Sequence, residues 1–124
     1  MIVVSVSKRY MAKRLIERDL KRSSASLLVL ALIEEGPLHG YEIGKRIEAR
    51  SNGRIAFNAA SLYPLLHRLE ERGWITGQWQ QNEGERRRRF YRITAGGRRT
   101  VAGERTLWQS FVGALDSVVN LKKA

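Results

Sequence analysis

The sequence predicts a mainly α-helical fold that carries one β-hairpin. First, in residues 59–73 four leucines recur with the i, i+3, i+4, i+7 spacing of one buried helical stripe. Second, residues 74–80 and 88–93 alternate between apolar and polar side chains on either side of a polar loop. Third, a long helical pattern covers residues 94–124. A short helix that ends at Gly73 and precedes a hairpin is typical of a winged helix-turn-helix, here followed by a C-terminal dimerisation helix.

Length and composition fit a single domain with short appendages. A chain of 124 residues with 43% hydrophobic content can bury a modest core. We expect a basic N-terminal extension over residues 1–19, a winged helix-turn-helix DNA-binding domain over 20–93 and the dimerisation helix over 94–124. The sequence has no cysteine, and no apolar run approaches the roughly 20 residues of a membrane span. A cytoplasmic location without a membrane partner is therefore predicted.

Basic residues are concentrated in two separate blocks. The formal net charge is +11, from 23 basic and 12 acidic side chains. Residues 1–22 and residues 74–99 each carry seven basic and two acidic groups, whereas residues 23–73 carry six of each. Two basic blocks around a neutral core indicate a polyanion that is contacted at several places. A basic surface that only confers solubility is the alternative, and the clustering argues against it.

The N-terminal third is expected to form two helices. Residues 1–7 show no helical pattern and should be frayed, while Met11 and Leu15 could line one face of a helix from about residue 9. This segment is either a basic arm on phosphates or on a partner subunit, or a solvated helix. A second, centrally buried helix is expected over residues 23–35, with serine as its N-cap and Gly36-Pro37 as its end.

Two further helices should form the helix-turn-helix. The first is expected over residues 38–51, where Ile43 and Ile47 give a buried stripe. The second is the leucine helix, for which Asn58 and Ser61 are both plausible N-caps. Pro64 would conflict with a helix interior, and a start near Ser61 would ease that conflict.

The hairpin and the terminal helix complete the predicted fold. In the hairpin Ile75, Gly77 and Trp79 should share one side, and about half of the strand arginines should point away from the core. The terminal helix should begin at the N-cap Thr94. Its positions at alternating spacings of three and four residues form a heptad seam, interrupted once by a glutamate. These positions hold Val101, Glu104, Trp108, Phe111, Leu115 and Val118. Such a face predicts a homodimer, with Trp108, Phe111, Leu115 and Val118 in the interface.

Three motifs resemble those of the PadR family of bacterial transcriptional regulators. Residues 35–43 read EGPLHGYEI, as family members do. The leucine helix reads AASLYPLLHRLEERGWI against a family pattern of roughly GTLYPLLxRLExxGxI. Residues 90–94 match the aromatic pair and xIT of the family. Ala60 and Ser61 depart from glycine and threonine; serine keeps the hydroxyl, and alanine affects how tightly the helix can begin. The resemblance covers residues 20–121 and implies the compact subfamily with a single C-terminal helix.

The resemblance identifies the leucine helix as the recognition helix, and its N-terminal residues should approach base edges and phosphates. The candidates that lie off the leucine stripe are Ser61, Tyr63 and Arg68, with Tyr41 and Lys45 on the flanking backbone. The wing should contribute Arg86, Arg87, Arg88 and Arg89 to phosphate binding. Each of these residues has an alternative interpretation as an ordinary surface residue.

Trp108 has two interpretations. On the seam it is most simply a dimer-core anchor. In compact PadR-like regulators the terminal helices can flank a pore where flat aromatic ligands stack on a tryptophan, and Trp108 matches that position. Glu104, one turn away, would then pair with a planar aromatic cation. Alternatively, Glu104 merely faces solvent.

The motifs of common enzymes are missing from the sequence. His39 and His67 lie on different predicted helices without cysteine companions, so neither a metal site nor a catalytic group is predicted, and no cofactor is expected. The leading hypothesis is a homodimeric, sequence-specific transcriptional regulator of double-stranded DNA. It would act as a repressor on a near-palindromic operator and be relieved by a small-molecule effector. The alternative is a sequence-indifferent, architectural nucleic-acid-binding protein.

Overall fold

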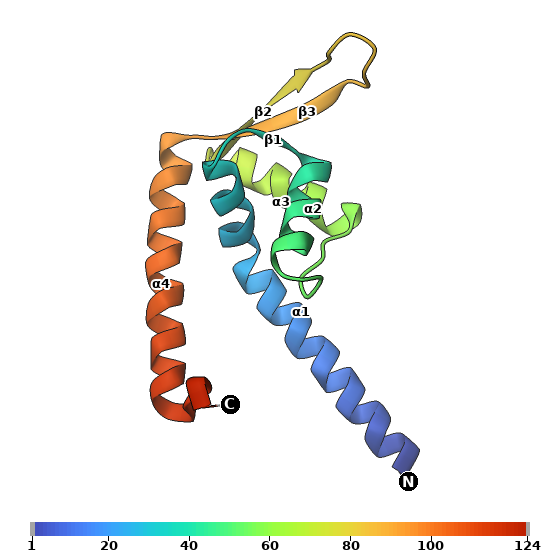
Figure 1. The fold of residues 1–124 in the computed structure, drawn as a ribbon, viewed down its shortest axis with the longest axis vertical. Helices are drawn as coiled ribbons and strands as arrows, with labels where there is room; N and C mark the ends of the chain where they lie inside the picture. The colour runs from blue at the N-terminus through green and yellow to red at the C-terminus, as the bar shows by residue number, and fades with distance from the viewer. Residues whose placement is uncertain (1, 124) are drawn as a thin grey trace.

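A computed structural model describes the backbone of residues 2–123 and the side chains of residues 18–122. Its elements follow the order α1 (Ile2–Glu34), β1 (Leu38–His39), α2 (Gly40–Arg50), α3 (Ala59–Glu71), β2 (Ile75–Gln80), β3 (Arg88–Ile93) and α4 (Ala95–Val119), with a final 3-10 turn at Leu121–Lys123. The β2–β3 hairpin projects from one end, and α1 and α4 extend away from it (Figure 1). This arrangement confirms the predicted winged helix class.

Helix α1 is continuous where two helices were predicted. It runs from Ile2 to Glu34, across the expected boundary at residue 19, and its backbone is helical through most of the segment expected to fray. The Oγ of Ser23 donates to the carbonyl of Asp19 and that of Ser24 to the carbonyl of Leu20, both at 2.9 Å. Because these hydroxyls bond one turn back, they do not cap a new helix, and the predicted serine N-cap is wrong. The face predicted from Met11 and Leu15 lies outside the described side chains.

The core forms where α1, α2, α3 and the sheet meet. The C-terminal half of α1 contributes Val29, Leu30 and Ile33, each at most 1% exposed, as expected for a central helix. The predicted stripes of α2 and α3 are also buried: Ile43 and Ile47 on α2, and Leu62, Leu65, Leu66 and Leu69 on α3. Burial of these aliphatic side chains supplies most of the folding free energy of a domain this small.

A short strand before α2 was not predicted. Leu38 and His39 form β1, which pairs antiparallel with β3 through Tyr91 and Phe90 and gives the strand order β1-β3-β2. Helix α2 therefore begins at Gly40 instead of residue 38. His39 is its N-cap, because the imidazole Nδ1 accepts a hydrogen bond from the Glu42 backbone N–H at 3.2 Å.

The N-terminus of α3 is set by Asn58. Its Oδ1 accepts from the Ser61 N–H at 2.9 Å, so the helix begins at Ala59 and Ser61 lies inside the first turn. Pro64 is consequently an internal residue, and the start near Ser61 that would have accommodated it is wrong. Pro64 cannot donate to the carbonyl of Ala60, but Ala60 is exposed and water can satisfy that group.

The hairpin and α4 match the prediction closely except at the C-terminus. Ile75, Gly77 and Trp79 stand opposite Ile93, Tyr91 and Arg89, so these six residues share one side. The Thr94 hydroxyl accepts from the Gly97 N–H at 3.0 Å and caps α4, as predicted. The helix ends at Val119 instead of residue 124, because Asn120 adopts the left-handed conformation, with φ 54°. Among the described residues, no helix is long and apolar enough to cross a membrane.

Candidate nucleic-acid interface

A groove lies between the hairpin, the start of α2 and the exposed side of α3. We call it the wing groove; its volume is about 430 Å³. It is lined by His39, Gly40, Tyr41, Tyr63, Trp79, Arg86, Arg87, Arg88 and Arg89. Tyr41 is 65% exposed and Tyr63 47% exposed, so both rings are accessible from solvent. The structure thus brings two predicted tyrosines together with all four predicted wing arginines.

The position of Tyr63 depends on Gly40. A Cβ built on Gly40 would lie 2.8 Å from Cε1 of Tyr63, a distance that real Cβ atoms do not adopt. Glycine at the first position of α2 therefore lets the Tyr63 ring of α3 lie directly against the α2 backbone. The nearby Tyr41 ring has the Lys45 ammonium 5.3 Å from its centroid, a cation–π contact. Tyr41 and Tyr63 form one aromatic side of the groove, and Lys45 lies against Tyr41 without lining the groove itself.

The four wing arginines are not equivalent. Nη2 of Arg89 lies 2.5 Å from Oε2 of Glu70 on α3, and both side chains are only 30% exposed. The Arg89 guanidinium also crosses Gly77, where any Cβ would collide with it, and lies 5.7 Å from the Trp79 ring centroid. Arg89 therefore joins the wing to α3, and this geometry commits its guanidinium to Glu70.

Arg86 and Arg87 are exposed at the outer end of the wing. The Arg87 guanidinium lies 4.9 Å from the centroid of the half-exposed Trp79 ring. Stacking on an indole positions the guanidinium while leaving its N–H groups available to an anion. These two residues are therefore the wing cations best placed to bind phosphate.

Arg88 reaches back to His39 at the base of the wing. Its Nη1 lies 2.9 Å from Nε2 of His39, while Nδ1 of the same ring caps α2. Burial, and then the charge of Arg88, lower the pKa of His39 below its ordinary value. The ring is thus neutral near pH 7, and a neutral imidazole accepts a hydrogen bond at only one nitrogen.

Ser61 and Arg68 lie on the other side of α3. They line a second groove, between α1 and α3, with a volume of about 450 Å³. Sequence reasoning grouped Ser61 and Arg68 with Tyr63 because all three lie off the leucine stripe. The helical spacing separates these residues: positions 61 and 68 are seven apart and share a face, whereas position 63 lies on a different side of the helix.

Helix α4 presents an apolar surface to solvent. Phe111 is 52% exposed and Val118 81% exposed, and Leu107, Val112 and Leu115 are exposed beside them. The Trp108 and Phe111 rings meet edge to face, with centroids 6.0 Å apart. Val101 is fully buried in its own domain, so the exposed part of the predicted seam starts after it. Glu104 and Trp108 are half-buried.

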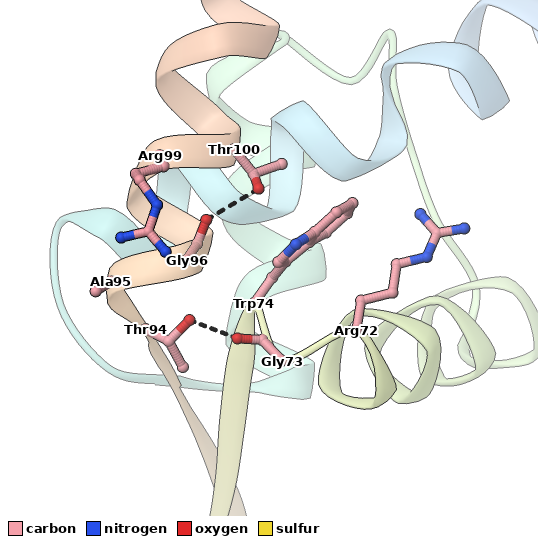
Figure 2. A pocket seen from close by; sticks show the side chains of 8 residues that line it. All are labelled: Arg72, Gly73, Trp74, Thr94, Ala95, Gly96, Arg99 and Thr100. Atoms are coloured by element: carbon pink, nitrogen blue, oxygen red, sulfur yellow. Dashed lines mark hydrogen bonds between the residues drawn. The ribbon is translucent and has the colours of Figure 1, made fainter.

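A third hollow, of about 660 Å³, lies at the junction of the hairpin and α4 (Figure 2). The Thr94 hydroxyl donates to the carbonyl of Gly73 at 2.6 Å, and the Arg72 guanidinium lies 5.1 Å from the Trp74 ring centroid. Gly97 packs so tightly on the Trp74 carbonyl that a Cβ there would overlap it. This junction connects α4 to the end of α3 through close contacts.

The described residues contain no group of three or more histidine, cysteine, aspartate or glutamate side chains that could hold a metal ion. What the fold presents is a hairpin wing, a helix with one exposed side, and cations and aromatic rings around it. These features define a winged helix-turn-helix nucleic-acid-binding domain.

The chain belongs to the PadR-like family of transcriptional regulators, whose family model matches residues 29–103. This confirms the resemblance seen in the sequence. The protein is therefore a DNA-binding transcriptional regulator, and its family is one of regulators rather than enzymes.

Individual relatives agree with this family. The chain is 31% identical over 88 residues to a transcriptional regulator of Mycobacterium tuberculosis, an alignment that covers 71% of this chain and 78% of that protein. A PadR family transcriptional regulator from Eggerthella lenta superposes with a TM-score of 0.78 at 25% identity, over 94% of this chain and 98% of that one. A transcriptional regulator from Clostridium thermocellum gives a TM-score of 0.75 at 28% identity, over 82% and 98%.

Proposed function

We propose that the protein is a homodimeric, sequence-specific repressor that binds a near-palindromic operator in the cytoplasm and is released by a small-molecule effector. The observation that carries the DNA-binding part is the wing groove. It places the Tyr41 and Tyr63 hydroxyls and the exposed guanidinia of Arg86 and Arg87 beside the outward side of α3. Cations and phenols in this position suit phosphate contacts that orient a recognition helix in the major groove.

The homodimer is supported by the apolar surface of α4. Several large apolar side chains on its C-terminal half are exposed to solvent, which is costly for an isolated protomer. Pairing with a second copy of α4 across a two-fold axis would bury this surface. Two recognition helices would then enter successive major grooves roughly 34 Å apart, and operator occupancy would block transcription.

The effector part of the proposal is supported by Glu104 and Trp108. Both are half-buried on successive turns of α4, next to the surface assigned to the dimer. An indole stacks on a flat ring and a carboxylate pairs with a positive charge, so the expected effector is a planar aromatic cation. It would release the operator by binding preferentially to a dimer whose two halves are at the wrong angle for DNA.

Footprinting on the protein's own upstream DNA, followed by competition, tests the proposal. A sequence-specific regulator should protect a near-palindromic site and keep it against a large excess of unrelated duplex, because specific binding is typically 10³-fold or more tighter. Complete displacement by an equal mass of random duplex would instead favour the alternative, a sequence-indifferent architectural protein.

A further inference from the structure

The groove between α1 and α3 has basic walls. Arg18, Lys21 and Arg22 come from α1, and Arg68 and Arg72 come from the C-terminal part of α3 and its cap. No carboxylate is among the residues that line it, and all four arginines are exposed. Residues 18–22 of α1 thus lie opposite α3, the helix on which the proposed DNA contact depends. We call this site the α1–α3 groove.

The arginines form two pairs with helical spacing. Arg18 and Arg22 are four residues apart on α1, and Arg68 and Arg72 are four residues apart at the end of α3. Like charges at this spacing destabilise a helix, and here the two pairs also line one groove. Arg72 is held over the Trp74 ring. An anion between the two walls would relieve both repulsions.

Lys21 fixes the floor of the α1–α3 groove. Its Nζ donates to the carbonyl of Ala56 at 2.9 Å and lies 5.2 Å from the Phe57 ring centroid. These contacts connect α1 to the segment that leads into α3. They place the basic residues of α1 beside α3.

The α1–α3 groove and the wing groove lie on opposite sides of the same helix. Ala60, Pro64 and His67 are exposed along the outward ridge of α3. Tyr63 leaves this ridge towards the wing, whereas Arg68 leaves it towards α1. A helix in the major groove lies between two phosphate backbones, one along each edge of the groove.

We propose that the α1–α3 groove binds the second phosphodiester backbone, on the opposite side of α3 from the wing. The proposal rests on the proposed function, in that α3 must enter duplex DNA. It assigns the wing block to one edge of the major groove, and residues 18–22 of the N-terminal basic block to the other. Arg18, Arg22 and Arg68 supply the charge-assisted contacts, and the Ser61 hydroxyl can donate to the same backbone.

The test measures how the affinity for a random duplex depends on salt concentration. The double variant Arg18→Ala/Arg22→Ala should lower the slope of log K against log salt by about 1.8 per bound protomer, because each protomer loses two phosphate contacts. Arg68→Ala, from the opposite wall, should lower it by about 0.9 per bound protomer. Arg18→Lys/Arg22→Lys keeps both charges and should keep the slope. The alanine variant should be as stable as the wild type, because alanine favours helix and the substitution removes a like-charge pair. Thermal unfolding of the variant checks this.

A charge-matched control separates local contact from net charge. Arg98→Ala/Lys122→Ala removes two exposed cations of the C-terminal part of the chain, neither of which lines either groove, and should leave the slope nearly unchanged. Phosphate ethylation interference on the operator should show two clusters of essential phosphates in each half-site with the wild type, and the Arg18→Ala/Arg22→Ala variant should lose one of the two.

Three outcomes would overturn the proposal. If Arg86→Ala/Arg87→Ala lowers the slope and Arg18→Ala/Arg22→Ala does not, the α1–α3 groove is off the DNA while the proposed function stands. If the α1 variant changes only the sedimentation mass, the groove is a protein–protein contact. If the wild type binds no duplex at all, the proposed function fails together with this inference.

Discussion

At the residue scale, His39 holds two contacts that its neutral ring cannot make simultaneously. Nδ1 must accept to cap α2, and Nε2 must accept to hold Arg88. A neutral imidazole has one acceptor nitrogen, so the tautomer that caps the helix turns an N–H towards Arg88 and releases it. We therefore expect Arg88 to alternate between His39 and solvent, or a phosphate when DNA is bound. Protonation removes both acceptors and adds a charge beside Arg88.

This arrangement predicts a pH dependence of stability. The pKa of His39 is lowered from its ordinary value of 6.5, so below that pH the unfolded chain binds more protons than the folded protein. The free energy of unfolding should therefore fall as pH drops from 7 to 5. His39→Asn keeps a side-chain cap but does not titrate, and its urea midpoint should change less over this range. Contributions that are common to both proteins cancel in the comparison. Identical pH profiles would mean that His39 does not contribute.

A second prediction at this scale separates Arg89 from Arg87. Arg89→Ala should lower the free energy of unfolding by about 1 kcal/mol, because it leaves Glu70 unpaired and uncovers Trp79. Arg87→Ala also removes a cation from the Trp79 ring but leaves no described carboxylate without its partner, and should change it by about 0.5 kcal/mol or less. Urea denaturation of both variants, with Glu70→Ala to complete a double-mutant cycle for Arg89, measures the difference. Equal effects would show that Arg89 is an ordinary wing cation.

At the scale of elements, the wing is a hairpin on which arginine side chains pack against Trp79. The sequence predicted the bounds of its two strands to within one residue. The alternation of apolar and polar side chains is a local pattern, so the sequence was sufficient to predict β2 and β3. The two-residue strand β1 was not, because it is too short to alternate and depends on pairing with β3. The break expected in α1 was wrong because serine suits both a cap and an internal bond to the preceding turn.

The candidate site was predictable in composition more than in arrangement. Tyr41, Tyr63 and the wing arginines do share a groove, as their motifs suggested. The commitment of Arg89 to Glu70 depends on a contact between residues 19 positions apart, which no helical or strand period reveals. The cap at His39 is a local contact, but histidine is not among the residues that usually cap a helix N-terminus. The basic pairs at 18 and 22 and at 68 and 72 have readable spacing, but only the fold shows that they line the same groove.

The wing as an element should contribute affinity without sequence specificity. Arg86→Ala/Arg87→Ala should weaken binding to operator and to random duplex by similar factors, because both contacts are to phosphate. The salt slope should fall by about 1.8 per bound protomer on both DNAs. Filter binding across a salt series is sufficient to measure it. A loss confined to the operator would instead assign base contacts to the wing, and an unchanged slope on both would place the wing away from the DNA.

At the scale of the whole molecule, assembly should depend on the exposed surface of α4. Phe111→Asp/Leu115→Asp would place charges in the proposed dimer interface and should shift the protein from dimer to monomer. Both side chains are exposed in the protomer, so the folded domain should survive, which circular dichroism would verify. Operator affinity should then fall towards that of a single half-site. Sedimentation of this variant as a stable dimer would refute the interface.

The effector proposal is tested on the same helix. Titration of a flat cationic dye should quench the emission of Trp108, and the quenching should be lost in Trp108→Phe while operator binding is retained. Trp74 and Trp79 also emit, so the Trp108→Phe protein is the necessary baseline. Glu104→Gln should weaken the dye affinity several-fold by removing the paired charge. Equal quenching in wild type and Trp108→Phe would exclude a pocket at Trp108.

The tight contact of Gly97 with the Trp74 carbonyl gives α4 the properties of a rigid lever arm. Over 25 residues, α4 is about 37 Å long. A tilt of about 10° at its base would move its far end by about 6 Å, roughly the rise of two base pairs. In a dimer joined at those far ends, a bulkier residue in place of Gly97 would change the distance between the two recognition helices. In the proposed dimer, Gly97 would thus help to set the preferred spacing of the two half-sites.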